Sequence, residues 1–260
     1  MARVRTTGDG SGLAVTEFGG SGEPVLLLHG LMGCAATWAP VARWLTAHGR
    51  VLAVDARGHG DSPAHGPWTV EAMAADLAPV LDGPGVVVGH SMGGLHGLAL
   101  AAARPDLVRA LVVEDMGVDF VGRDAEAARA WFGAVPQPFA SPEAVREAFG
   151  WPRPEFGDYM AECVERRADG LHLRTSAADA AEIAGEWART AFWPLLDAVR
   201  CPVLLLEAEE SVAPPGQMAE MARRLPGATH VRVPGSGHLV HRAAPEAYRA
   251  AVEAFLARLS

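Results

Sequence analysis

The chain has 260 residues, half of them apolar, which is enough to bury the core of one α/β domain. Its formal net charge of −9 disfavours nucleic acid and anionic membranes as partners, because both carry negative charge. The first residues lack the apolar stretch of a signal peptide, and no apolar run is long enough to span a bilayer. We therefore expect a cytoplasmic protein. Its three cysteines are too few and too scattered for a disulfide scaffold or a C-x-x-C metal site: Cys34, Cys163 and Cys201.

The first predicted elements are strands. Val4–Thr6 and Leu13–Phe18 flank Gly8-Asp9-Gly10, which predicts an antiparallel hairpin at a sheet edge. Short apolar runs then alternate with helical patterns, as in the βα units of a mostly parallel sheet. Their nearly continuous apolar character is typical of strands that helices cover on both faces. These runs are Val25–Leu28, Val51–Val54, Val86–Val88, Ala110–Val113, Val203–Leu206 and His230–Val233.

Helices are predicted between the runs, and Thr37 and Thr69 are their candidate N-caps, because a hydroxyl can accept a hydrogen bond from the first helical turn. The predicted helices are Trp38–Ala47, Val70–Leu81, Met92–Arg104, Gly216–Arg224 and Pro245–Leu259.

The stretch 118–193 breaks this rhythm. It contains no strand-like apolar run, and it has helical patterns at Ala125–Phe132 and Pro142–Phe149. Structureless loops of this length are uncommon. We therefore predict a helical cap at 118–193, inserted into an α/β core formed by 1–117 and 194–260. The alternative is a pair of crossover helices with long loops.

Aromatic residues are frequent in this stretch. They either line an apolar acyl pocket or pack the cap helices. Phe192 and Trp193 are candidates for packing where the cap rejoins the sheet. The full set is Phe120, Trp131, Phe132, Phe139, Phe149, Trp151, Phe156, Trp187, Phe192 and Trp193.

The segment Gly89-His90-Ser91-Met92-Gly93 lies between a Val-rich strand and an Ala/Leu-rich helix. The pattern G-x-S-x-G in that setting predicts a sharp turn that exposes the hydroxyl of Ser91 as a nucleophile. Side chains at 89 or 93 would collide with the neighbouring strand or helix, so glycine is needed there. The alternative is a plain strand-to-helix turn.

A serine hydroxyl needs a base. His238 follows the last predicted strand, and such a loop lies at the carboxyl edge of a doubly wound sheet, on the same side as Ser91. His241 is interpreted as a polar residue at a helix start or facing the cap. His59, His65 and His96 are interpreted as structural or exposed residues.

An oxyanion hole needs two backbone donors. The Leu31 N–H follows the first parallel strand, and the Met92 N–H opens the helix after Ser91, so these two are the candidates. Gly30 lets the first of these segments approach closely. His29 is interpreted as a residue that ties neighbouring loops together rather than as a catalytic group.

Four motifs in order along the chain carry a family resemblance: Leu28–Gly33, Asp55–Ser62, Gly89–Gly94 and Gly237-His238. Together they resemble the α/β-hydrolase superfamily. The first motif, with Trp38 after it, is similar to serine esterases of the YbfF and ABHD11 types. The resemblance covers essentially the whole chain and is weakest in the cap. It implies the α/β-hydrolase fold, a mostly parallel doubly wound sheet, and a structural role for Asp55–Ser62.

The acid that orients His238 has two candidates. Asp115 ends the strand after the nucleophile helix, and Glu210 ends the next strand. The superfamily usually places an aspartate at the second location, but Glu207–Ser211 contains none, and some members carry the acid at the first. We favour Asp115, with Glu210 as the alternative. Either residue could instead be a solvated loop carboxylate.

The residues predict hydrolysis of a carboxylic ester or thioester through an acyl-enzyme on Ser91. A serine at this position argues against the dehalogenase and epoxide-hydrolase branches, which use aspartate. No cofactor or metal is implied. The expected partner is a small-molecule ester, and the chain is expected to be a monomer or homodimer. The alternatives are a carbon–carbon bond hydrolase, a cofactor-free peroxidase, or a ligand-binding receptor on the same fold.

Overall fold

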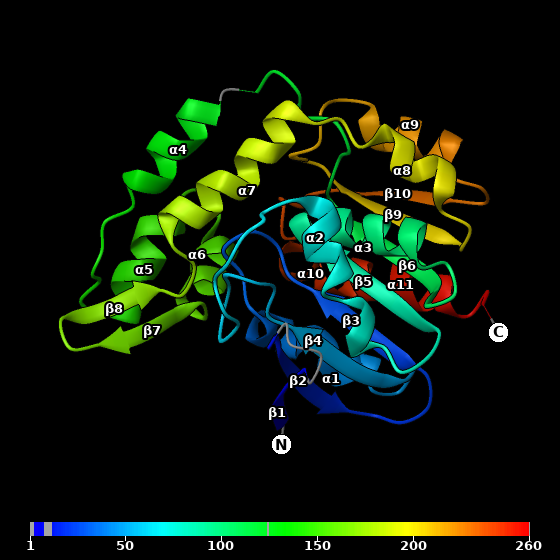
Figure 1. The fold of residues 1–260 in the computed structure, drawn as a ribbon, viewed down its shortest axis with the longest axis horizontal. Helices are drawn as coiled ribbons and strands as arrows, with labels where there is room; N and C mark the ends of the chain where they lie inside the picture. The colour runs from blue at the N-terminus through cyan, green and yellow to red at the C-terminus, as the bar shows by residue number, and fades with distance from the viewer. Residues whose placement is uncertain (1–2, 8–11, 124, 260) are drawn as a thin grey trace.

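The structure is a computed structural model that describes residues 3–7, 12–123 and 125–259. Within these ranges the chain forms an eight-stranded sheet with helices on both faces, and a further segment lies to one side of it (Figure 1). The strands of the sheet are β1 (Arg3–Thr6), β2 (Ala14–Gly19), β3 (Pro24–Leu28), β4 (Arg50–Val54), β5 (Gly85–His90), β6 (Val108–Glu114), β9 (Val203–Ala208) and β10 (Thr229–Val233).

The strands lie in the order β1-β2-β4-β3-β5-β6-β9-β10. β2 pairs antiparallel with β1 and β4, and every other neighbouring pair is parallel. This confirms the predicted mostly parallel sheet, and each of the six apolar runs lies within a strand. The edge hairpin is confirmed in β1 and β2, while its predicted turn, Gly8–Gly10, lies outside the described residues.

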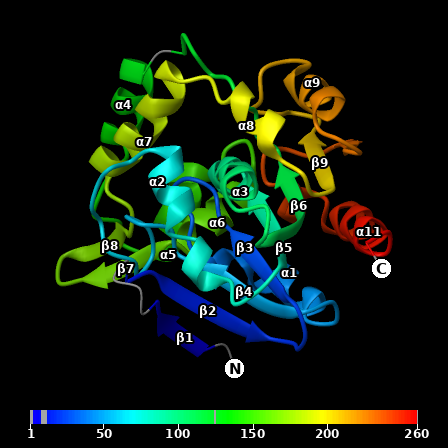
Figure 2. The ribbon, with the colours of Figure 1, turned by 45° about the vertical axis from the view of Figure 1, so that its right-hand side comes forward.

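Side chains of the central strands alternate between two apolar layers. In β3, Leu26 and Leu28 pack into one layer, and Val25 and Leu27 pack into the other. Figure 2 shows α2, α3 and α8 on one face and α11 on the other. The helices of this part are η1 (Ala35–Trp38), α1 (Ala39–Leu45), α2 (Val70–Ala75), η2 (Ala78–Val80), α3 (Met92–Ala103), α8 (Trp193–Ala198), α9 (Gln217–Arg224), α10 (Val240–Ala243) and α11 (Pro245–Leu256).

One of the two N-cap predictions is wrong. The Thr69 hydroxyl accepts a hydrogen bond from the Ala72 N–H and caps α2, as predicted. Thr37 instead lies inside the 3-10 helix η1, where its hydroxyl donates to the Cys34 carbonyl at 2.7 Å. The helix predicted over 70–81 divides into α2 and η2, because Pro79 has no N–H to continue the helical hydrogen bonds.

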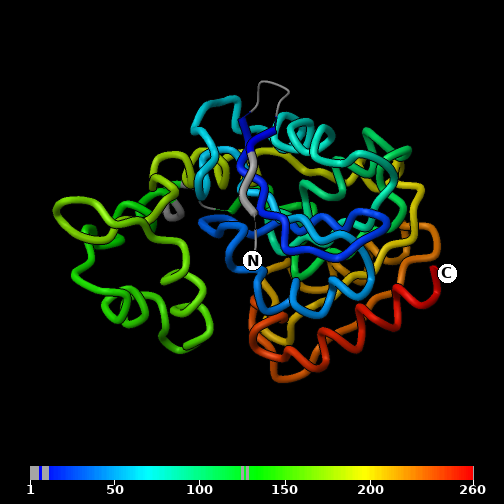
Figure 3. Tube along the Cα trace, turned by 90° about the horizontal axis from the view of Figure 1, so that it is seen from below, coloured from blue at the N-terminus to red at the C-terminus, as the bar shows by residue number. Residues whose placement is uncertain are grey.

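The segment predicted as a helical cap contains four helices and, in addition, a two-stranded antiparallel hairpin. It lies beside the carboxyl ends of the strands, to the left in Figures 1 and 3. The hairpin is an addition to the predicted helices, and it has no apolar run that could have indicated it, because three of the four residues of β7 are charged. Its elements are α4 (Ala125–Gly133), α5 (Pro142–Phe149), α6 (Pro154–Ala161), β7 (Val164–Arg167), β8 (Gly170–Leu173) and α7 (Ala177–Arg189).

None of the helices in the described part of the chain combines the length and the apolar character that crossing a membrane requires.

Candidate active site

Ser91 occupies the sharp turn between β5 and α3. Its backbone has φ 52° and ψ −121°, a conformation that side-chain-bearing residues rarely adopt. The flanking glycines make the turn possible: a Cβ at Gly89 would lie 2.3 Å from the Gly93 carbonyl oxygen, and one at Gly93 would lie 2.2 Å from that of Leu28. The Ser91 N–H donates to the Glu114 carbonyl at 2.8 Å. The turn is therefore fixed to the end of β6.

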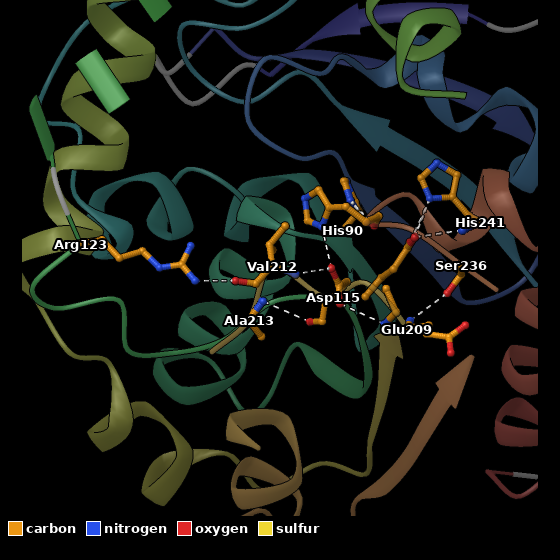
Figure 4. A network of polar contacts seen from close by, with 12 residues as sticks. His90, Asp115, Arg123, Glu209, Val212, Ala213, Ser236 and His241 are labelled. Atoms are coloured by element: carbon orange, nitrogen blue, oxygen red, sulfur yellow. Dashed lines mark hydrogen bonds and ion pairs between the residues drawn. The ribbon is translucent and has the colours of Figure 1, made fainter. Parts of the chain in front are cut away.

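The structure brings His238 and Asp115 together. His238 Nδ1 lies 2.7 Å from Asp115 Oδ2. Asp115 is fully buried and also accepts from the N–H groups of Ala208 (3.0 Å) and Val212 (3.1 Å), as Figure 4 shows for Val212. Burial raises the pKa of the Asp115 carboxyl, but the hydrogen bond and charge of His238 lead the opposing effects and bring it below its ordinary value. The carboxylate is therefore ionised at neutral pH.

Glu210, the alternative acid, is turned away from His238. It is exposed, and its carboxylate pairs with the guanidinium of Arg153, whose Nε lies 3.1 Å from Oε2. This ion pair lowers the pKa of Glu210. Of the two candidate acids, only Asp115 has a geometry that can orient the His238 ring.

The two segments that carry the backbone donors proposed for an oxyanion both adjoin Ser91: a Cβ at Gly30 would lie 3.2 Å from the Ser91 Cβ. Leu31 lines the cavity described below together with Ser91, and Met92 begins α3, the helix that opens directly after Ser91. Within the described ranges, neither amide N–H has a hydrogen-bond acceptor. A Cβ at Gly30 would lie 2.7 Å from the His90 ring, so glycine permits the close approach of this loop.

His29 ties two loops together, as predicted. Its Nε2 accepts from the Ala56 N–H at 3.0 Å, so Nδ1 carries the proton and donates to the Gly30 carbonyl at 2.8 Å. Burial lowers the pKa of His29 to about 4, which keeps the ring neutral. Asp55 likewise accepts from the N–H groups of Ala35 and Asp61, which supports the structural role inferred for that turn.

One polar pair next to the site was missed by the sequence reasoning. Glu114, directly before Asp115, is fully buried, and its Oε1 lies 2.8 Å from His241 Nδ1 and 3.0 Å from the His241 backbone N–H. His241 does lie at a helix start, but it faces this carboxylate and not the cap. The available signal was two successive carboxylates at a strand end and two histidines three residues apart.

His90 connects the turn to the base. Its Nε2–H donates to the His238 carbonyl at 3.1 Å, and the two ring centroids are 4.5 Å apart. Burial lowers the pKa of His90 well below its ordinary value, so the ring is neutral at pH 7.

A cavity of about 620 Å³ lies between the core and the cap segment. Ser91 and His238 line it together with mostly apolar residues. Of the ten aromatic residues considered for a pocket, five line it, while Phe139 and Phe149 pack within the cap and Trp151 is exposed. Phe192 is buried in the core beneath the point where the segment rejoins the sheet. The five lining aromatics are Phe120, Trp131, Phe132, Phe156 and Trp187.

No group of three or more His, Cys, Asp or Glu side chains within the described ranges is arranged to hold a metal ion. Ser91 and His238, which face the cavity, are residue types suited to nucleophilic and acid–base chemistry.

Comparison with known proteins places the chain in a family. The model of the alpha/beta hydrolase family matches residues 25–251. The chain belongs to this family. It is 31% identical to the sn-1-specific diacylglycerol lipase ABHD11 of Mus musculus over 258 residues, which cover 90% of this chain and 80% of that protein.

Two further relatives agree with this assignment. The match to the lipase LipV of Mycobacterium tuberculosis is 44% identical over 115 residues, and it covers 42% of this chain and only 44% of that protein. The solved structure of E-2-(acetamidomethylene)succinate hydrolase is 30% identical, superposes with a TM-score of 0.86 and covers 98% of each chain. The fold and the hydrolase family are therefore established.

Proposed function

We propose that the chain hydrolyses small-molecule carboxylic esters through an acyl-enzyme on Ser91. The observation that carries this proposal is the 2.7 Å contact between His238 Nδ1 and the buried Asp115 carboxylate, with His238 and Ser91 lining one apolar cavity. The relatives named as lipases favour an ester over other hydrolysable bonds.

In the proposed mechanism, Asp115 holds the proton of His238 on Nδ1 and leaves Nε2 free to act as the base. His238 takes the proton of the Ser91 hydroxyl as its oxygen attacks the ester carbonyl, and returns that proton to the leaving alcohol. The N–H groups of Leu31 and Met92 stabilise the oxyanion. Water then attacks the acyl-enzyme with His238 again as the base, which releases the acid and restores Ser91.

The proposal is tested by labelling and turnover together. A fluorophosphonate probe should label wild type at Ser91, and p-nitrophenyl butyrate should be hydrolysed. Ser91→Ala should lose both the label and turnover while its melting temperature stays close to that of wild type. A folded wild type that neither takes the label nor hydrolyses a panel of esters and thioesters would contradict the proposal and favour a ligand-binding receptor.

A further inference from the structure

The cavity above Ser91 holds one side chain with a permanent charge among its described lining residues, and this is Arg123. The other ionisable groups are His90, His238 and Tyr159. Burial keeps His90 and Tyr159 neutral, since it lowers the pKa of the first and raises that of the second. A guanidinium stays protonated at any physiological pH. Among the described lining residues, the cavity therefore presents one permanent positive charge beside mostly apolar side chains, and Arg123 itself is exposed to solvent.

The guanidinium of Arg123 is held in place but is not neutralised. Its Nη2 donates to the Val212 carbonyl at 2.8 Å, and its central carbon lies 4.7 Å from the centroid of the Phe120 ring. Both partners also line the cavity. A guanidinium has five N–H donors, and this one has no carboxylate partner in the described part of the chain. Arg129 and Arg153, also in the cap segment, each pair with a glutamate instead.

The backbone before Arg123 is fixed to the core. The N–H groups of Val118 and Asp119 both donate to Gln217 Oε1, and Trp193 Nε1 donates to the Asp119 carboxylate at 2.9 Å. Figure 4 shows the Arg123 side chain reaching Val212, whose own N–H donates to Asp115. Arg123 is therefore positioned relative to the candidate catalytic residues before any substrate arrives, which reduces the ordering cost of binding.

We propose that Arg123 binds a carboxylate at the end of the substrate remote from the scissile carbonyl. The preferred substrates are then monoesters of short dicarboxylic acids. A planar guanidinium fork matches the two oxygens of a carboxylate. A dianion such as a phosphate monoester would leave one of its charges unpaired beside the mostly apolar lining of the cavity, whereas a carboxylate matches the single guanidinium. This inference rests on the proposed ester hydrolysis at Ser91.

The test compares two esters of the same size that differ in charge, monoethyl glutarate and ethyl glutaramate, at neutral pH. Because Arg123 is exposed to solvent, which screens its charge, we expect wild type to prefer the acid by only about tenfold in kcat/KM. Arg123→Gln should abolish this preference, so that the ratio of kcat/KM for the acid to kcat/KM for the amide ester falls to about one, and Arg123→Lys should keep part of it. Arg129→Gln is the matched control. It removes a positive charge from the cap segment at a position that does not line the cavity, and it should retain the full preference for the acid. Monoethyl succinate and adipate then report the chain length that spans the cavity.

Two results would overturn the inference: a wild type that does not discriminate between the esters, or a preference for the acid that survives in Arg123→Gln. Failure of the proposed function looks different, because then neither ester is hydrolysed and Ser91 is not labelled. Free glutarate gives a readout that does not need turnover. It should raise the melting temperature of wild type more than glutaramide does, and Arg123→Gln should lose that difference.

Discussion

Two carboxylate–histidine pairs, whose carboxylates are neighbours in the sequence, differ in what surrounds them. Asp115 pairs with His238 and Glu114 pairs with His241, at 2.7 and 2.8 Å. In the first pair the histidine side chain is 26% exposed and lines the cavity, whereas in the second it is 1% exposed and stacks on Trp38. The same two functional groups therefore differ in access. The open pair, Asp115–His238, borders the cavity, where we propose that it transfers protons, and the sealed pair, Glu114–His241, joins the end of β6 to α10.

The largest expected effect is the fall in kcat when the open pair loses its carboxylate. Asp115→Asn should lower kcat for a neutral ester by about 10³- to 10⁴-fold, because the amide cannot stabilise the His238 imidazolium or fix its tautomer. Steady-state kinetics on p-nitrophenyl butyrate measures this. Glu210→Gln is the matched control and should stay within about twofold, since Glu210 is exposed and pairs with Arg153. The assignment is wrong if the two variants exchange these outcomes.

The next effect concerns buried histidines that lack a carboxylate partner. Burial lowers the pKa of His29 to about 4 and of His59 and His96 to about 3, and lowers that of His90 well below 6.5. Above about pH 6.5, the ordinary pKa of a histidine in the unfolded chain, these rings are neutral in both the folded and the unfolded state, so the fold has its full stability there. This stability is lost as the pH falls from there toward the folded-state values, because the unfolded chain binds protons first.

Together these four groups should lower the free energy of unfolding by about 4 kcal/mol between pH 6.5 and about pH 5.5. Urea unfolding at several pH values measures this drop. His96→Leu removes one titrating group from the middle of α3 and should reduce the drop by about a quarter. A free energy of unfolding that stays flat across this range would refute the prediction.

The fold was largely predictable because its signals are local. The apolar runs of the parallel strands and the glycines around Ser91 are readable within about ten residues, and the structure places strands and a strained turn there. The β7–β8 hairpin was not, because Val164–Arg167 has three charged residues after its valine and so lacks the apolar run of a strand; it pairs with β8 through the backbone.

The site was only partly predictable, for the same reason. Ser91 and His238 carry their own sequence patterns. The choice between Asp115 and Glu210 depends on which carboxylate contacts His238. Asp115 lies 123 residues before His238 in the sequence, and no local pattern encodes the contact between them. Glu114 and His241 are 127 residues apart, so their contact could not be inferred from either segment alone.

The sealed pair should matter more for stability than for turnover. Glu114→Gln should lower the free energy of unfolding by about 3 kcal/mol, because it breaks a fully buried pair. Its effect on kcat should stay below about tenfold, since Asp115 and His238 remain intact. Glu207→Gln is the matched control: Glu207 also contacts a histidine, His230, at 2.7 Å, but both are partly exposed, so the cost should be under about 1 kcal/mol. Equal costs for the two variants would contradict the contrast between sealed and open pairs.

The smallest expected effect tests whether the two pairs are linked through His90. Its ring lies 4.5 Å from His238 and 5.5 Å from His241, and it donates to the His238 carbonyl.

His90→Leu removes that hydrogen bond, worth about 1 kcal/mol, and should lower kcat about fivefold with KM unchanged. His90→Gln keeps an N–H donor and should recover most of this loss. If the ring transmits the position of the sealed pair to the base, His90→Leu and Glu114→Gln should combine non-additively in kcat. Additive effects, or a Gln variant no better than Leu, would mean that each pair holds its own part of the loop independently.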